Sequence, residues 1–264
     1  MPKAEKNFYK EKLIMDMLKT YLDIVTGHLS RLEQTQKETV AKAAVIMADR
    51  IAEDKLIFAY GPGGHSNLGT QEIFFRAGGL MHINPILDEG TLLSSGGLRS
   101  MAIERLPGYG RIVMEKSGFA KDDVLILINA YGINSALIDA ALFCKEIGGK
   151  LIAVSSRQHA TNTAPDHPAR HPTKKNLCDI ADVLLDCDVP IGDAMVNIEG
   201  VPQNVGAIST FANSYLLNCL VLETVQVLAG RGIVPPIWRS GNAPGGDEWS
   251  KQFLDRFKGR VRLL

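Results

Sequence analysis

From Lys55 onward, short apolar runs alternate with segments of helical pattern, and this alternation limits the chain to few folds. Val124–Ile128 (VLILI) is apolar at every position, which is typical of a strand buried on both faces of a parallel sheet. Such sheets are covered by helices, so we predict an α/β fold. We expect strands at Leu56–Tyr60, Leu80–Asn84, Val124–Asn129, Leu151–Ser155 and Val183–Asp186, and helices at about Asn67–Ala77, Ser135–Ile147 and Ile208–Leu228.

The residues before this domain have the pattern of two helices. A helical hairpin cannot bury its apolar stripe alone, so we expect it to pack on the remaining chain or on a second copy. The predicted division is a hairpin at 1–54 and an α/β domain with a C-terminal tail at 55–264. Residues at helical spacing are Met17, Tyr21 and Ile24 in the first helix, and Val40, Ala44, Met47 and Ile51 in the second.

Composition excludes several classes of partner. The 264 residues carry 29 basic and 29 acidic side chains, with no basic block, so we expect no nucleic-acid partner. No apolar run approaches the roughly 20 residues that span a bilayer, so we expect no membrane contact. The N-terminus lacks the apolar stretch of a signal peptide, and the four cysteines form no CxxC pair. These features favour a reduced, cytoplasmic protein.

A glycine-rich turn, Gly61–Gly64, follows the first expected strand and precedes a helix. Glycines at such a turn let backbone N–H groups approach a ligand closely, and the start of a helix favours an anion. The segments Asn129–Asn134 and Ser155–His159 also follow strands of the predicted sheet. Ligands of parallel sheets bind at the carboxyl ends of the strands, so we expect these three loops to share one site.

Further motifs are FFRAGG (Phe74–Gly79), NPILD (Asn84–Asp88), RHP (Arg170–Pro172), PIGDA (Pro190–Ala194) and PGGDE (Pro244–Glu248). Together with the Gly–His–Ser loop, they make the chain similar to the SIS (sugar isomerase) domain family, in the branch near phosphoheptose isomerase. The resemblance implies a three-layer α/β/α flavodoxin-like fold with a parallel sheet, here preceded by the helical hairpin. It also implies a homo-oligomer, dimer or tetramer, with sites near subunit interfaces, and no organic cofactor.

The second loop departs from the family's pattern. The family's phosphate loop is rich in serine, whereas Asn129–Asn134 has the sequence NAYGIN. A phosphate dianion needs many hydrogen-bond donors, and a loop with an amide, a phenol and backbone N–H groups could instead suit a singly charged sulfonate or carboxylate. We therefore leave open a sugar phosphate or a sulfonated hexose such as sulfoquinovose.

Isomerising an aldose to a ketose needs a base that moves a proton between adjacent carbons. We predict Glu72 as this base, because its place on the apolar stripe of its helix is costly unless the carboxylate faces a cavity or a partner. The alternative is an ion pair with Arg76, four residues on. His65 could assist ring opening or bond the loop backbone, and His171 could reach a site or be solvated.

The remaining predicted ligands of the sugar lie in or near the same loops. For the acids among them, and for Glu104, turn stabilisation is the simpler interpretation. Metal binding by His159, His167 and His171 is an alternative that their spacing does not support, so we expect no metal. The predicted substrate-binding residues are Gly63, Gly64, Ser66, Asn67, Asp88, Asn129, Tyr131, Asn134, Ser155, Ser156, Arg157, Asp193, Ser209, Thr210, Asp247 and Glu248.

These observations favour an aldose–ketose isomerase that acts on an anionic sugar through an enediol. Two alternatives remain open at this point. One is a non-catalytic regulator that binds a sugar phosphate, and the other is an SIS-type lyase that cleaves a sugar ether after the same proton abstraction.

Overall fold

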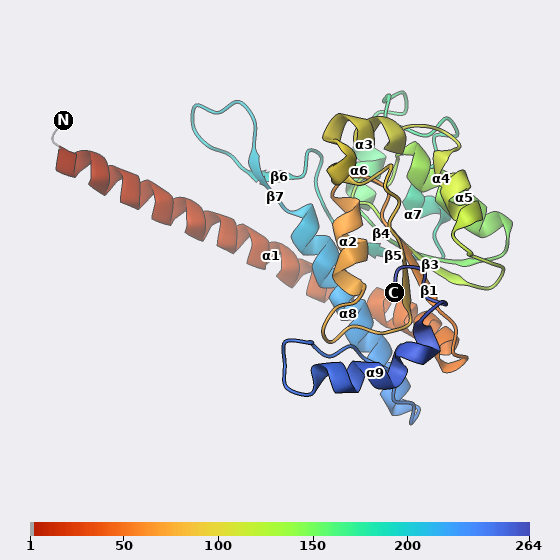
Figure 1. Cartoon of the computed structure of the whole chain (residues 1–264). Helices are drawn as coiled ribbons and strands as arrows, with labels where there is room; N and C mark the ends of the chain where they lie inside the picture. Colours follow the sequence, from red (N-terminus) through yellow and green to blue (C-terminus); the bar gives the residue numbers. More distant parts are fainter. Residues whose placement is uncertain (1–2) are drawn as a thin grey trace.

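The computed structural model has a five-stranded parallel sheet at its centre (Figure 1). It describes residues 3–264, with side chains from Met17 onward. The strand order is β2-β1-β3-β4-β5, the flavodoxin-like order. The strands are β1 (Ile57–Tyr60), β2 (Ile83–Ile86), β3 (Val124–Ile128), β4 (Lys150–Ser155) and β5 (Val183–Asp186).

Helices cover both faces of the sheet and make the three-layer α/β/α fold expected from the sequence. One face packs against α1 (Lys3–Ala52), α2 (Ser66–Ile73) and α8 (Ser209–Gly230). The other packs against α4 (Tyr109–Lys116), α5 (Ser135–Glu146) and α7 (Leu177–Ile180). Outside these layers are the 3-10 helix Leu93–Ser95, α3 (Gly97–Glu104), α6 (Arg157–Asn162), α9 (Gly246–Phe257) and an antiparallel hairpin of β6 (Ala194–Val196) and β7 (Val205–Ala207).

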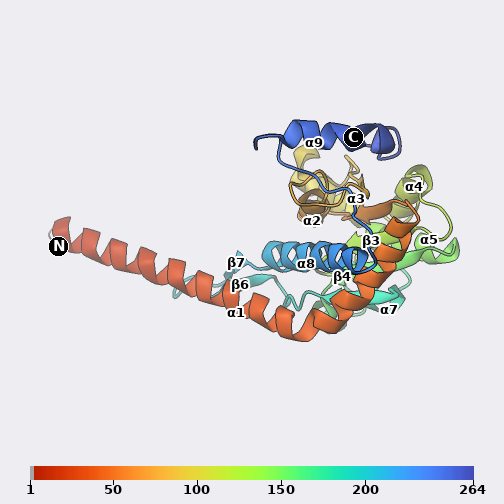
Figure 2. The same ribbon diagram turned by 90° about the horizontal axis from the view of Figure 1, so that it is seen from below.

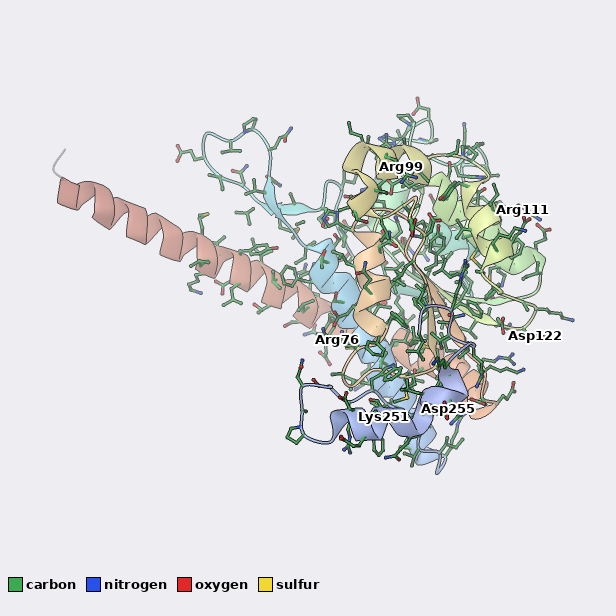
Figure 3. All side chains as sticks on the ribbon, viewed as in Figure 1. Arg76, Arg99, Arg111, Asp122, Lys251 and Asp255 are labelled. Atoms are coloured by element: carbon green, nitrogen blue, oxygen red, sulfur yellow. The ribbon has the colours of Figure 1, made fainter. Side chains whose placement is uncertain are left out.

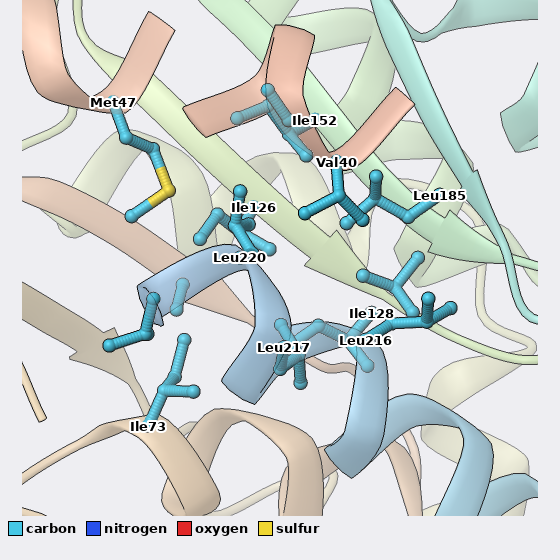
Figure 4. Packing of buried hydrophobic residues seen from close by; sticks show 14 of the residues in the cluster. Val40, Met47, Ile73, Ile126, Ile128, Ile152, Leu185, Leu216, Leu217 and Leu220 are labelled. Carbon is cyan, nitrogen blue, oxygen red and sulfur yellow. The ribbon is translucent and has the colours of Figure 1, made fainter. Parts of the chain in front are cut away.

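Alternate residues of the central strands supply two separate hydrophobic cores. Ile126 and Ile128 of β3 belong to the core under α1 and α8, whereas Leu125 and Leu127 belong to the core under α5. Figure 4 shows the first core, with Ile126 and Ile128 among side chains of α1, α2 and α8. All five residues of β3 are buried, as its continuous apolar sequence predicts.

The predicted N-terminal hairpin is wrong, because residues 3–52 form one helix, α1. Between the two predicted apolar stripes, residues 25–39 contain no proline, and α1 continues through Gly27. Figure 2 shows that α1 bends and that its N-terminal part extends away from the sheet. Its C-terminal part packs on α8 and the sheet, through Val40, Ala44 and Met47. Residues 1 and 2 of the predicted hairpin lie outside the described chain.

The second strand, β2, begins three residues later than predicted. Leu80 instead makes an isolated antiparallel bridge with Ile237, and β2 begins at Ile83. Pro85 within β2 lacks an N–H donor, and it is tolerated because β2 is at the edge of the sheet.

Helix α8 is the one described helix that is long and apolar enough to cross a membrane by length and composition. It packs against α1, α2 and β4, and residues such as Leu217 and Leu220 are buried in the core. A core helix with several apolar faces has the same composition.

The close contact between α4 and α5 gives a test of the fold. A Cβ atom added at Gly110 of α4 would overlap the carbonyl of Ala136 on α5, and neither backbone can move cheaply. We expect Gly110→Ala to lower the free energy of unfolding by at least about 2 kcal/mol in urea denaturation. Gly230→Ala is the control, since a Cβ there meets open space. Equal stability of the two variants would contradict this packing.

Candidate functional site

The carboxyl ends of β1 and β3 form the switch point of the sheet. The two strands are neighbours, but α2 follows β1 onto the α1–α8 face, whereas α5 follows β3 onto the opposite face. Open α/β sheets bind ligands at this point, outside the carboxyl ends of the strands. The loops 61–66 and 129–134 follow these two strands. We call these loops, together with the Glu104 side chain that lies against them, the switch-point site.

The side chain of Asn129 joins the two loops. Its Nδ2 donates to the carbonyl of Pro62 at 3.3 Å and to Ser66 Oγ at 3.1 Å. Its Oδ1 accepts from the backbone N–H groups of Tyr131 at 3.0 Å and Gly132 at 2.9 Å. Asn129 therefore braces the site and takes up two amides that could otherwise bind an anion. Since Ser66 Oγ only accepts from Asn129, its own proton can be donated to a ligand.

The first turn of α2 is tied to the segment that follows β2. Asn67 Nδ2 donates to the carbonyls of Gly63 at 2.9 Å and Thr91 at 3.1 Å. Ser100 Oγ of α3 donates to the same Thr91 carbonyl at 2.8 Å. Asp88 Oδ2 accepts from the Thr91 N–H at 3.1 Å. Asn67 and Asp88, both predicted to bind the sugar, thus hold the framework next to the site.

Two glycines of the first loop lie where a side chain does not fit. Gly63 has a φ of +110°, and a Cβ there would overlap the carboxylate of Glu104. A Cβ at Gly64 would stand 2.5 Å from Leu93 Cδ2. His65, the next residue, is exposed at the start of α2, and its side chain has no hydrogen bond within the described residues. Packing against Glu104 and Leu93 explains the need for these glycines, and their close approach to a ligand stays a prediction.

Glu104 is a residue of this site whose importance the sequence did not reveal. Its half-buried carboxylate, at the end of α3, lies against Gly63. Burial raises the pKa of this carboxyl from 4.5 to about 7, and the neighbouring positive charge of Arg105 opposes the rise only partly. The segment between β2 and α4 contains the 3-10 helix Leu93–Ser95 and α3. The helical backbone of α3 fixes the direction of Glu104.

Tyr131 brings a phenol to the second loop. Its ring stacks on His159 of α6, with centroids 4.2 Å apart and an angle of 22° between the planes. Burial raises the pKa of Tyr131, and the negative charges of Asp193 and Glu104 add to the rise, so the phenol stays protonated. Burial lowers the pKa of His159, which favours a neutral imidazole. Tyr131 therefore brings a protonated phenol, a hydrogen-bond donor, to the second loop.

Asp193 caps α8 instead of facing the site freely. Its Oδ1 accepts from the N–H groups of Ile208 at 3.0 Å and Ser209 at 2.8 Å, and its Oδ2 accepts from Ser209 Oγ at 2.6 Å. The N-terminus of α8 already carries a carboxylate, so it is not open to a second anion. Ser209 is committed to this cap, while Thr210 is half-buried in the first turn. Binding of the sugar by Asp193 and Ser209 stays a prediction that the cap makes costly.

The residues after β4 divide between framework and site. Ser156 Oγ donates to the Val189 carbonyl at 2.6 Å and accepts from the His159 N–H at 3.2 Å, so it caps α6. Ser155 is buried, its Oγ has no partner within the described chain, and it lies beside Gly132 of the second loop. Arg157 is exposed, and its guanidinium lies 3.7 Å from Asp179.

Asn134 is the N-cap residue of α5, directly after the second loop. It is buried, and its Oδ1 has no hydrogen-bond partner in the part of the chain that the structure describes. Asn134 thus lies next to the site with an unused acceptor.

His171 holds three segments near the site together. Its Nε2 donates to Asp139 Oδ1 of α5 at 3.1 Å, and its Nδ1 accepts from Thr173. Its backbone N–H donates to the Ile133 carbonyl of the second loop at 2.9 Å. Asp139 Oδ2 in turn accepts from the Gly108 N–H, just after α3. Both ring nitrogens are engaged, so the catalytic role of His171 stays a prediction and would require breaking these bonds.

Glu72 lies six residues after Ser66 on α2, about 9 Å along the helix from the first loop. Its carboxylate accepts from Asn218 Nδ2 of α8 at 3.1 Å and lies 3.4 Å from Arg76. Figure 3 shows Arg76 beyond the end of α2 that is remote from Arg99 of α3. The alternative interpretation, an ion pair with Arg76, is present, and the predicted role of Glu72 as base stays a prediction.

Asp247 and Glu248 begin α9, far from the two loops within this chain (Figure 1). Asp247 lines a separate hollow of about 380 Å³ with Phe75 and Trp238. The structure therefore does not bring these two acids into the switch-point site. Contact between them and a ligand there would need a second copy of the chain.

No cluster of three or more metal-binding side chains occurs from Met17 to Leu264. His159 is stacked on Tyr131, His167 Nδ1 accepts from the Ala169 N–H at 3.2 Å, and His171 is bonded as described. The site thus offers acids, a phenol, hydroxyls and backbone amides for chemistry on a small polar ligand.

The chain belongs to the SIS domain family, which matches residues 20–156. It is similar to a UPF0309 protein of Thermoanaerobacter pseudethanolicus, with 31% identity over 252 residues, 94% of this chain and all of the relative. It is also similar to a UPF0309 protein of Brucella anthropi, with 33% identity over 240 residues, 91% of this chain and 96% of the relative.

A solved structure has the same fold. It is a phosphoheptose isomerase of Neisseria gonorrhoeae, 16% identical, with a TM-score of 0.54, covering 82% of this chain and 99% of that one. Together with the sheet order, this similarity confirms the three-layer α/β fold predicted from the sequence.

The Asp193 cap predicts a specific effect on stability. Asp193 has a φ of +64°, so Asp193→Ala loses three hydrogen bonds and also places alanine in a left-handed conformation. We expect this variant to lose about 2 to 3 kcal/mol of unfolding free energy. Asp193→Asn, which keeps an acceptor and tolerates this backbone, should lose much less. Similar losses in urea denaturation of both variants would contradict the cap.

Glu104 predicts a pH-dependent effect on stability. Because its pKa is raised, the folded protein keeps a proton that the unfolded chain releases between pH 4.5 and about 7, so Glu104 weakens the fold as the pH rises. We expect Glu104→Gln to be more stable than the wild type at pH 8, by up to about 3 kcal/mol, and equally stable near pH 4. Urea denaturation at both pH values tests this.

The control is Glu115→Gln on α4, whose exposed carboxylate pairs with Arg111. This variant should gain no stability at pH 8, since it loses a surface ion pair and relieves no burial. If Glu104→Gln is also no more stable than the wild type at pH 8, Glu104 is not a desolvated carboxylate.

Proposed function

We propose that this protein is a cytoplasmic aldose–ketose isomerase that binds an anionic sugar at the switch-point site and uses no organic cofactor. The observation that carries the proposal is the junction of the two loops through Asn129. It leaves His65, Ser66 and Tyr131 around a glycine backbone, where a polar ligand can approach. The fold shared with a phosphoheptose isomerase supports a sugar phosphate as the ligand class.

The reaction needs a base beside donors for the oxygens of the enediol. Acids and donors are present together at this edge of the sheet, with Tyr131 protonated and the Ser66 hydroxyl proton free. His65 is exposed at the mouth of the first loop, where it can assist opening of the sugar ring. No electron acceptor is required, because one sugar carbon is oxidised while its neighbour is reduced.

The anionic group of the sugar is either a phosphate or a sulfonate. Asn129 occupies the N–H groups of Tyr131 and Gly132, and Asp193 occupies the start of α8. Arg157 lies near Asp179 and is exposed. Fewer free donors and nearby negative charges favour a singly charged group over a phosphate dianion. A sulfonated hexose is therefore a strong alternative to a sugar phosphate.

We also propose that the protein forms a homo-oligomer with sites near subunit contacts. Leu18 and Leu22 on the extended part of α1 are 68% and 60% exposed, and Leu222 on α8 is 69% exposed. Leu32, Tyr215 and Leu222 line a groove of about 200 Å³ between α1 and α8. Apolar surface of this extent along two neighbouring helices is typical of a contact between proteins.

The proposed reaction is tested by exchange with solvent deuterium. Thermal-shift measurements against fructose 6-phosphate, sedoheptulose 7-phosphate and sulfoquinovose identify the sugar that binds. We expect that sugar to incorporate deuterium at the carbon next to the carbonyl in D₂O, as measured by NMR, and to be converted to its isomer. Tight binding without exchange would favour a sugar-binding regulator, and loss of an ether substituent would favour a lyase.

Asn129→Ala tests the place of the reaction. Removing the brace between the loops should weaken binding of the active sugar at least about tenfold, since an unmade hydrogen bond to a positioned loop costs about 1 to 3 kcal/mol. Asn162→Ala is the control, because Asn162 on α6 is exposed and bonds only within its own helix. Unchanged affinity in Asn129→Ala would place the sugar elsewhere.

A further inference from the structure

We propose that Glu104 of α3 is the base that moves the proton between the two sugar carbons. This inference rests on the proposed isomerase function. It differs from the prediction made from the sequence, which assigned the proton to Glu72 and gave Glu104 a role in a turn. Three observations carry it: the position of Glu104, its lack of partners, and the way α3 is fixed.

The first observation is position. A Cβ atom built on Gly63 would overlap the Glu104 carboxylate and would lie 3.9 Å from Asn129 Nδ2. The Glu104 carboxylate and the Asn129 amide are therefore both next to Gly63. Gly63 belongs to the loop after β1, and Asn129 begins the loop after β3. Glu104 therefore reaches the junction of the two loops from a third segment of the chain. A sugar lying over the glycine backbone there is within reach of its carboxylate.

The second observation is that Glu104 has no hydrogen bond and no ion pair among residues 17–264, whereas three other acids near the site, Asp88, Asp139 and Asp193, are engaged. Asp88 accepts from Tyr109 and Thr91, and Asp193 accepts from the start of α8. Asp139 accepts from His171 and the Gly108 N–H. A buried carboxylate without partners is costly to the fold. Such a cost is common at functional sites, where the group is kept available for a ligand.

Burial, more than the charges nearby, determines the pKa of Glu104. The positive charge of Arg105, the next residue, favours the ionised form, and the negative charge of Glu104 in turn raises the pKa of the Tyr131 phenol in the second loop. Burial outweighs Arg105 and raises the pKa of Glu104 to about 7. A base is most effective when its pKa is near the working pH. Glu104 thus has the acidity that the reaction needs without help from a metal.

The third observation is that α3 is fixed to the first loop. Ser100 Oγ of α3 and Asn67 Nδ2 of α2 both donate to the Thr91 carbonyl, at 2.8 Å and 3.1 Å. Beyond Glu104, the Gly108 N–H donates to Asp139 at 2.6 Å. The segment is anchored on both sides of Glu104, which holds the carboxylate in one direction. A catalytic base benefits from this, because small displacements reduce the rate of proton transfer.

The proton transfer balances without any further reagent. Ionised Glu104 takes the proton from C2 of the open-chain aldose, and the electron pair of that C–H bond forms the C1–C2 double bond of an enediolate. Glu104 then returns the proton to C1, while the O2 proton passes to O1, giving the ketose. C2 is oxidised and C1 is reduced. We assign the protonated Tyr131 phenol as the donor of a hydrogen bond to the enediolate oxygen.

The experiment compares Glu104→Gln, Glu104→Asp, Glu72→Gln and Glu115→Gln with the wild type. Each variant is measured for deuterium exchange with the sugar that binds the wild type, and for affinity by thermal shift. We expect Glu104→Gln to reduce exchange at least 1000-fold with affinity changed less than tenfold, and Glu104→Asp to keep partial activity. Glu115→Gln, in the exposed pair with Arg111, should match the wild type.

A direct titration tests Glu104 without any substrate. In protein labelled with ¹³C at the glutamate side-chain carboxyl, we expect one NMR signal to titrate near pH 7 and to be missing in Glu104→Gln. The rate of exchange in the wild type should rise through the same pH. Absence of such a signal from the folded wild type would overturn the proposal.

The possible outcomes separate this inference from the proposed function. Exchange that survives in Glu104→Gln but is lost in Glu72→Gln would overturn the role of Glu104, assign the base to α2 and leave the isomerase intact. A wild type that binds a sugar and exchanges no deuterium would overturn the isomerase and this inference together.

Discussion

The side chain of Asn129 is the interaction on which the site depends. Neighbouring strands of a parallel sheet bring their loops close, but nothing in the sheet itself fixes the loops to one another. Asn129 does so with all of its hydrogen-bonding capacity, donating to the loop after β1 and accepting from its own loop. The glycine turn, residues 61–64, is thereby held against the side chains of Leu93 and Glu104.

The distribution of negative charge explains why one carboxylate differs from the rest. The acids around the carboxyl edge of the sheet neutralise helix ends and loop amides, as Asp193 does for α8. Each such acid stabilises the fold and is thereby unavailable to a ligand. Glu104 differs from these acids. Its carboxylate, at the end of α3, lies against Gly63, which has no side chain that could bind it. The chain gives up stability at this residue, which is a frequent property of residues selected for activity.

The sequence predicted the sheet well and the site only in part. Continuous apolar strands are decided by burial, so β1, β3 and β4 were predicted to within one residue at each end. The N-terminal hairpin was wrong because two apolar stripes on one uninterrupted helix look the same as two helices. The glycines and Asn129 were recognised because loop chemistry is local. Glu104 was not, because its meaning depends on the packing of α3 against Gly63, and no local pattern in IERLPGYG reveals that contact.

The carbonyl of Thr91 accepts from both α2 and α3, and this shared acceptor has a mechanical consequence. A shift of the glycine turn is transmitted to α3, which carries Glu104, since α2 and α3 both donate to the Thr91 carbonyl. If α2 and α3 moved apart, one of these two hydrogen bonds would break, so we expect the two helices to move together. A ligand that displaces the glycine turn would then also displace Glu104. Under the proposed function, binding at the turn and the positioning of Glu104 would therefore be coupled.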